Sequence, residues 1–399
     1  MLRARLTAPA AALLAASFVT GCLDRGSEAL LGNSAPDSAG RQQWTVIFAG
    51  DGGQVWIAQT DSAVAVQGDS SREAPASLWS VLDSAPDLRD LRFRARVDGR
   101  RMQLAILDGM DTVASGDGAL LSYAGSAGAP RFAGRASLTG SGATRTVRFD
   151  AIGGVPMPEV PIHERPAPAP TPVAAPGIVS LRIDDCGRAD SASLAALERF
   201  HLVGSFAVPS RLVGRAASCS PALLRAIADA GNAVESHSRL HSWPPPTFAE
   251  FYLETVGSRR DLVAMGYDPR VFVQPGSWDT GPTLFDSPAK LETPYGALLR
   301  RVYEAVEAYQ QVDPLVPIPA LGARWPTPRE ITFLSVAQIA SYTREAAARH
   351  GWIEFMWHSG AEPRPALEAK LAAIAALRDS GYVANLPFRD ALHAVPAAP

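Results

Sequence analysis

Short apolar or alternating runs, separated by turns rich in Gly, Asp and Ser, occupy the first part of the chain. Alternation with a period of two is typical of strands that bury one face. The strands predicted in this way cover residues 44–48, 55–58, 63–66, 91–97 and 146–149. The pattern predicts a small β-rich domain over residues 43–154, either a sandwich or a barrel. A glycan-binding module, a partner-binding module and a spacer all fit this domain.

From about residue 178 the pattern changes, and apolar strand-like runs alternate with amphipathic helical stretches. Strands are predicted at 178–184, 203–208, 232–236, 270–274, 352–357 and 382–386. Helices are predicted at 190–200, 221–230, 247–265, 295–311, 336–349 and 365–380. Repeated strand–helix units predict an α/β fold, a distorted (β/α) barrel of parallel strands. In such a fold the functional residues lie at the C-terminal ends of the strands.

A stretch rich in Pro and Ala separates the two patterns, and such a segment is extended and semi-rigid. The predicted organisation is a lipoprotein signal peptide over 1–21, a polar tether over 22–42, the β-rich accessory domain over 43–154, a linker over 155–177 and the α/β domain over 178–399.

The first residues are typical of an export signal. A charged start precedes an apolar run over 6–20, which is too short and too rich in Ala for a spanning helix. The run ends in Val19-Thr20-Gly21-Cys22, which resembles a bacterial lipobox. The resemblance implies cleavage before Cys22, attachment of lipid to it, and anchoring in the cell envelope. Because Leu23 follows the cysteine, the outer membrane is the expected destination. A plain secretory signal with an incidental cysteine is the alternative.

Composition narrows the choice of function. Hydrophobic residues make up 47% of the chain and charged residues 19%, enough for a sizeable core. The net charge of −3 and the lack of a basic run argue against nucleic-acid binding. Two cysteines, Cys186 and Cys219, follow the signal. In an exported chain they could form a disulfide, and two free buried thiols are the alternative.

Candidate chemistry is concentrated at three predicted strand ends. Asp184 and Asp185 end one strand, His237 and His241 follow another, and His358 follows a third. One carboxylate and two imidazoles are a common ligand set for a divalent cation, which leaves the second carboxylate for proton transfer. A helical turn would place the two histidines on one face. The set indicates metal-assisted hydrolysis. Taken singly, an Asp pair is often a turn or a helix cap, and paired histidines are often incidental.

These residues resemble the motifs of the polysaccharide deacetylase family, in the family's order, over about residues 178–399. The matching segments are Ile183-Asp184-Asp185-Cys186 for T-F-D-D-G, His237-Ser238-Arg239-Leu240-His241 for H-[ST]-x-x-H, Val273-Gln274-Pro275-Gly276 for the third motif and Trp357-His358-Ser359 for the late histidine motif.

The resemblance implies a metal-dependent hydrolase that removes acetyl groups from an N- or O-acetylated envelope glycan, such as an acetylated polysaccharide or peptidoglycan. The bonds that such an enzyme hydrolyses would be carbon–nitrogen bonds other than peptide bonds. It further implies that Asp185, His237 and His241 hold the metal, that Asp184 is the general base, and that His358 protonates the leaving amine. Zinc is the family's usual cation, and Co²⁺ or Ni²⁺ could replace it.

The chain departs from the family pattern at three places. Gln274 stands where the family has an arginine that pairs with the base, so the base is expected to lose its ionic partner, although Gln274 and Pro275 could still contact substrate or orient the base. The fourth motif has no clear counterpart; Arg324-Trp325 is the nearest substitute, and Trp325 could contact sugar. Cys186 replaces a glycine. These departures favour a second hypothesis, a non-catalytic, metal-containing, glycan-binding lipoprotein of the same fold.

Overall fold

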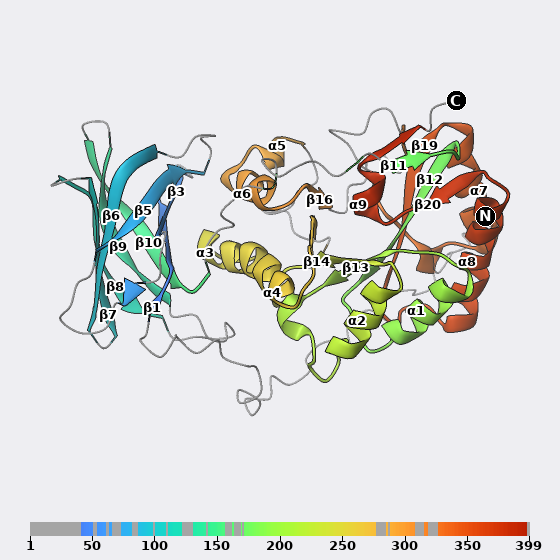
Figure 1. Cartoon of the computed structure of the whole chain (residues 1–399), viewed down its shortest axis with the longest axis horizontal. Coiled ribbons are helices and arrows are strands. Elements are labelled where there is room, and N and C mark those ends of the chain that lie inside the picture. The colour runs from blue at the N-terminus through green and yellow to red at the C-terminus, as the bar shows by residue number, and fades with distance from the viewer. Residues whose placement is uncertain are drawn as a thin grey trace, which may run out of the picture.

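The computed structural model describes most of the chain from residue 41 onward (Figure 1). The described residues are 41–50, 54–60, 64–65, 73–81, 87–98, 100–108, 111–121, 131–140, 143–155, 162, 169, 171–276, 285, 288–307, 315–317 and 326–396. The predicted signal peptide, residues 22–40 of the predicted tether with the lipidated Cys22, and the candidate sugar contact Trp325 lie outside these ranges. Within them, no helix combines the length and the apolar character needed to cross a bilayer.

The N-terminal part of the chain forms a closed antiparallel barrel (Figure 1). Around the barrel the strands are β10 (Ala143–Gly153), β2 (Trp44–Ala49), β3 (Val55–Thr60), β5 (Glu73–Ser80), β6 (Asp87–Asp98), β7 (Arg101–Asp108), β8 (Asp111–Leu120) and β9 (Arg131–Gly140). Two short strands, β1 (Arg41–Gln42) and β4 (Val64–Ala65), pair with each other in a separate sheet. Of the two architectures that the sequence allowed, the structure has the barrel.

Alternate side chains of these strands point inward and fill the barrel with apolar groups. Phe48, Phe93 and Phe149 are fully buried there. On β8, Cβ atoms at Gly116 and Gly118 would lie only 2.9 and 2.7 Å from the ring of Phe149. The glycines therefore make room for that ring, because interiors are close-packed and tolerate no such overlap.

One outer face of the barrel packs on helix α3 (Phe248–Tyr252), which lies between the barrel and the rest of the molecule in Figure 1. Ile47, Ile57 and Ile152 share one apolar cluster with residues of α3. The hydroxyl of Tyr252 donates to the carbonyl of Val155 at 2.8 Å. Packing on α3 covers the outer face of β2, and the other face of this strand lines the barrel interior. Residues 44–48 are therefore all buried, instead of alternating between buried and exposed.

The C-terminal part of the chain forms a sheet of mainly parallel strands. In spatial order these are β16 (Ala305–Glu307), β15 (Val271–Val273), β14 (Ala233–Ser236), β13 (Ser205–Val208), β12 (Gly177–Asp184), β19 (Gly351–His358) and β17 (Val316–Pro317), with β18 (Arg329–Glu330) paired to β19 and β20 (Val383–Asn385) paired to β12. Only the β17–β19 pair in this sheet is antiparallel among the described strands. The predicted parallel strand–helix architecture is confirmed, as an open sheet in the described residues.

The sheet is strongly curled. The guanidinium of Arg182 on β12 contacts the carboxylate of Glu307 on β16, four strand spacings away. In a flat sheet the two strands would lie about 19 Å apart, farther than an arginine side chain reaches. The sheet therefore closes most of a barrel and brings its edge strand β16 opposite β12.

Helices cover the outer face of the sheet, with their apolar sides against it. They are α1 (Asp190–Arg199), α2 (Pro221–Asp229), α4 (Ser258–Ala264), α6 (Pro294–Val302), α7 (Val336–Ala348) and α8 (Arg364–Asp379), with the short α5 (Pro288–Leu291). The short α9 (Phe388–Ala391) packs in a separate cluster with Ile178 and Trp352. Leu181 and Ile183 on β12 pack in one core with Leu197 of α1 and Leu371 of α8. Within the predicted linker, β11 (Thr171–Val173) pairs with β21 (Ala394–Pro396), and the domain boundaries stay predictions.

The predicted helix over 295–311 is wrong for residues 303–307, and its last residues, 308–311, lie outside the described ranges. Helix α6 ends at Val302, Tyr303 is extended, and the strand β16 follows. A short apolar run such as this fits a buried strand as well as a helix, and periodicity alone does not separate them. The error matters, because β16 carries Glu307 into the curled sheet.

Candidate metal centre

The two adjacent aspartates diverge because the chain turns sharply after β12. Asp185 and Cys186 both adopt positive φ, 80° and 46°. This left-handed turn costs backbone energy for residues with a side chain. It leaves Asp184 fully buried, whereas the side chain of Asp185 remains 40% exposed. Neighbouring carboxylates therefore have separate surroundings and can take separate roles.

A disulfide braces this turn. Cys186 and Cys219 are bonded, with their Cα atoms 5.3 Å apart. The amide of Cys219 donates to the carbonyl of Cys186, and a bridge joins Gly187 to Ser218. Of the two alternatives for the cysteines, the structure has the disulfide. It ties the turn that carries Asp185 to the segment before α2.

The two histidines lie on a loop after β14, so the predicted helical turn is wrong. Ser238 and His241 have positive φ, 64° and 60°, which folds the loop back on itself. Oε2 of Glu254 accepts from the amides of Arg239 and Leu240 at 3.0 and 2.8 Å. Glu254 belongs to a π-helical turn, Leu253–Gly257, between α3 and α4. Such turns are frequent at functional sites, and here one holds the histidine loop.

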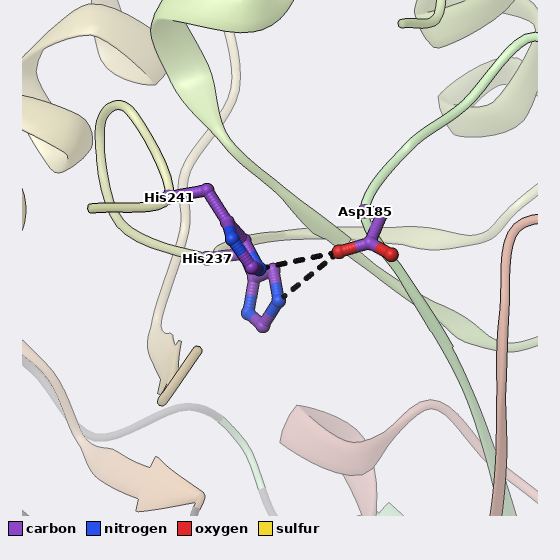
Figure 2. Close-up of side chains that lie close together, drawn as sticks. All are labelled: Asp185, His237 and His241. Carbon is purple, nitrogen blue, oxygen red and sulfur yellow. Dashed lines mark ion pairs between the residues drawn. The ribbon is translucent and has the colours of Figure 1, made fainter. Parts of the chain in front are cut away.

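Asp185, His237 and His241 point toward one another (Figure 2). One ligand atom from each lies within 4.8 Å of the others. Nε2 of His241 is 3.3 Å from Oδ1 of Asp185, and Nε2 of His237 is 3.7 Å from the same oxygen. Nδ1 of His237 lies 2.9 Å from the carbonyl of Val273 and donates to it in the tautomer that leaves Nε2 free. A histidine held through its other nitrogen is the usual arrangement of a metal ligand.

The electrostatics of the three residues agree with a cation site. Burial opposes ionisation of Asp185, but contacts with His237 and His241 outweigh it and hold the pKa of Asp185 below its usual range. Burial disfavours the imidazolium of His241, yet Asp185 raises its pKa on balance. In the protein without metal, the protonated form of His241 is thus favoured beside Asp185. Two nitrogens and one carboxylate oxygen suit zinc and its neighbours.

Asp184 has an ionic partner, contrary to the prediction from the sequence. Nε and Nη2 of Arg182 lie 2.9 and 3.0 Å from the two carboxylate oxygens of Asp184. The sequence contained the signal for this pair. Arg182 interrupts an apolar strand, and residues two apart on a strand face the same side.

His358 ends β19 directly beside Asp184, because the two residues are register partners in the parallel pair β12–β19. Its Nδ1 lies 3.6 Å from Oε1 of Glu330, which ends β18. Sequence reasoning missed Glu330, since no motif marks it and the strand is two residues long.

The remaining predicted residues lie in different surroundings. Gln274 is buried; its amide donates to the carbonyl of Gly276 at 3.3 Å and its oxygen accepts from the amide of Phe285 at 2.9 Å. Pro275 is also buried. Trp357 is fully buried in the core against α1, as predicted for core packing. Gln274 thus fastens the loop that it begins.

No family model and no curated protein matches the chain. Solved structures with similarity to it include a family 4 carbohydrate esterase from Streptomyces lividans in complex with acetate, at 18% identity and a TM-score of 0.38, over 56% of this chain and all of that one. A chitin deacetylase from the fungal pathogen Colletotrichum lindemuthianum has 18% identity and a TM-score of 0.39, over 58% and 95%. A CE4 family pseudoenzyme from Bacillus anthracis has 16% identity and a TM-score of 0.37, over 57% and 71%.

Proposed function

We propose that this chain is a metal-dependent hydrolase that removes acetyl groups from an N- or O-acetylated glycan of the cell envelope. The observation that carries the proposal is the convergence of Asp185, His237 and His241, with ligand atoms within 4.8 Å of one another. A buried carboxylate, Asp184, directly precedes Asp185, and a strand-end imidazole, His358, is the register partner of Asp184. Metal ligands with a separate acid and base are the components that hydrolysis of an acetyl group requires.

Each residue has a role in this proposal. Asp185, His237 and His241 would hold the cation, with zinc as first choice and Co²⁺ or Ni²⁺ as replacements. When bound, the cation would supply Lewis acidity toward the acetyl carbonyl and water. Asp184 would accept the proton of the attacking water, and His358 would donate a proton to the departing nitrogen or oxygen of the sugar. The products would be acetate and a free amino or hydroxyl group on the glycan.

The test is acetate release by zinc-loaded protein from acetylated chitooligosaccharides and peptidoglycan fragments. We expect Asp184→Asn to lower release by about 1,000-fold or more, because the variant loses its general base. Elemental analysis should find the zinc content unchanged in that variant and lost in His237→Ala and His241→Ala. Asp379→Asn, at a surface carboxylate, is the matched control and should keep both activity and zinc.

Zinc-loaded wild-type protein that releases no acetate from any member of the panel would contradict this function. Binding of the same oligosaccharides by that protein would then support the non-catalytic glycan-binding hypothesis. In that case Asp184→Asn should leave binding intact.

Placement in the envelope is a separate part of the proposal. We propose that lipid on Cys22 anchors the protein there after export. Labelled palmitate should enter the wild-type protein and not Cys22→Ser, and the variant should leave the membrane fraction. Equal labelling of the two proteins would exclude Cys22 as the lipid site.

A further inference from the structure

A cluster of charged side chains is fully buried inside the curled sheet. It consists of Arg182 and Asp184 on β12, Glu307 on β16 and Glu354 on β19, each with no exposed surface. Taking an ion out of water costs several kcal/mol unless a partner offsets it. Each of the four side chains must therefore either contact a group of opposite charge or be uncharged.

Arg182 lies between two carboxylates. The edge formed by Nε and Nη2 faces Asp184, at 2.9 and 3.0 Å, and Nη1 contacts Oε1 of Glu307. A guanidinium is a rigid planar fork, so contacts on two sides fix its orientation. The orientation of the Asp184 carboxylate follows, because Nη2 donates to its Oδ2 at 3.0 Å and Nε lies close to its Oδ1.

Glu354 takes the neutral form beside this pair. Burial and the neighbouring Glu307 raise the pKa of Glu354 well above its usual range. The cluster therefore contains one cation, Arg182, for the two carboxylates that contact it, Asp184 and Glu307, and the neutral form of Glu354 adds no further charge.

Gln274 cannot supply a charge to Asp184, and its amide nitrogen already donates to Gly276. We propose that Arg182 is the positioning residue for the general base, in place of the residue at 274, and that Glu307 holds the guanidinium in the required orientation. This inference rests on the proposed function. Because Arg182 contacts the carboxylate of Asp184 directly, it acts on the reaction through Asp184.

The first experiment compares Arg182→Gln and Arg182→Lys with wild type in the acetate assay. We expect Arg182→Gln to lower kcat by about 100-fold, within the range that a correctly placed base contributes, with KM and zinc content unchanged. Arg182→Lys keeps the positive charge and loses the planar fork of the guanidinium, so its kcat should lie between that of wild type and that of Arg182→Gln. The control is Arg259→Gln, which removes another buried arginine, paired with Asp268 on the outer side of the sheet. A kcat of Arg182→Gln within threefold of wild type would overturn the proposal.

The second experiment separates positioning from folding. Arg182→Gln leaves Glu307 buried without its cation, and breaking such a pair is strongly destabilising. The double variant Arg182→Gln with Glu307→Gln removes one charge of each sign and should recover much of the lost stability. We expect its kcat to stay as low as that of Arg182→Gln. Recovery of kcat together with stability would show that Arg182 serves the fold only, and the proposal would fail.

The two proposals fail in different ways. If zinc-loaded wild-type protein releases no acetate, the hydrolase function falls, and crystal structures of wild type and the double variant then decide on Arg182. A displaced Asp184 carboxylate in the variant, with Asp185, His237 and His241 unmoved, sustains the positioning role. An Asp184 carboxylate in the same place in both structures overturns it.

Discussion

The barrel and the curled sheet differ in what fills them. Trp44, Phe93 and Phe149 are among the apolar side chains inside the barrel, whereas Arg182, Glu307 and Glu354 are buried inside the sheet. Apolar burial stabilises a fold without directing any chemistry. Buried ions cost desolvation and need partners, but they can fix the orientation of a reactive group. We therefore expect changes inside the barrel to alter stability alone, and changes inside the sheet to alter reactivity.

The largest effect on stability should come from Phe149→Ala in the barrel. Removing a buried phenylalanine leaves a cavity and lowers the free energy of unfolding by about 3–5 kcal/mol. The glycines opposite the ring have no side chains to fill it. Denaturant unfolding measures the loss, with Thr146→Ala on the exposed side of the same strand as control. At temperatures where the variant is folded, kcat should match wild type. A fall in kcat would break the distinction between the two interiors.

Removal of the disulfide beside the metal-ligand candidate Asp185 should have the next largest effect on stability. Cys186 and Cys219 are 33 residues apart, and closing a loop of that length stabilises a chain by about 4 kcal/mol in the chain-entropy account. We expect the double variant Cys186→Ser with Cys219→Ser to lose this stability and to bind zinc more weakly, since the turn carrying Asp185 loses its brace. Calorimetry and zinc titration measure both effects.

Reductant provides the control for the disulfide. It should shift wild-type protein toward the double variant and leave the variant unchanged. Unaltered zinc affinity in the variant would show that the left-handed turn at Asp185 holds itself without the bond.

A smaller effect, dependent on pH, is expected at Asp190 at the start of α1. Burial raises the pKa of Asp190 from its ordinary value of 3.8 to about 7. Between these values the unfolded chain has released the proton and the folded protein has not, so stability falls as pH rises through this window and levels off above it. Asp190→Asn has no carboxyl group to titrate, so its stability should not fall with pH in this way. The variant keeps an acceptor for the amide of Gly187, which donates to Asp190 at 2.9 Å.

In metal-free protein, Asp190→Asn should match wild type near pH 4 and exceed it by about 2 kcal/mol near pH 8, a discounted value for a shift of about three pH units. Unfolding curves at both pH values measure it. An equal difference at the two pH values would mean that Asp190 ionises normally in the fold.

The same contrast explains how far the sequence could be interpreted. In the sheet region, periodicity identified most strands and helices, because each buries one face or both against its neighbours. In the barrel it missed β5, β7, β8 and β9. Strand β8 contains Gly116 and Gly118, which depress strand propensity and are explained by close neighbours on other strands, among them the ring of Phe149. Packing across an interior is invisible to a pattern along one strand.

The candidate site shows the same limit. The motif spacing predicted that Asp185, His237 and His241 would gather at the strand ends, and the structure brings them together. The partners of Asp184 and His358 were not predicted. Arg182 was detectable in principle from its place two residues before Asp184. Glu307 was not, since it reaches Arg182 only through the curl of the sheet, and its strand was predicted as helix.

The smallest effect on stability is expected where the barrel contacts α3. It tests whether this contact also influences the metal-ligand candidates. Tyr252 donates to the carbonyl of Val155, which also accepts from Thr45 at 3.0 Å. Tyr252→Phe leaves that acceptor with one partner, so stability should fall by about 1 kcal/mol, measured by unfolding.

Tyr252 also directly precedes the π-helical turn whose Glu254 holds the histidine loop. If the barrel only docks there, zinc affinity and kcat of Tyr252→Phe should equal those of wild type. If the barrel braces the loop, zinc affinity should fall while Phe149→Ala, deeper in the barrel, still leaves it unchanged. These two results together would show that the contact between the barrel and α3 stabilises the histidine loop, and that the packing inside the barrel does not. The difference between the interiors would then stand, with α3 as the element that connects them.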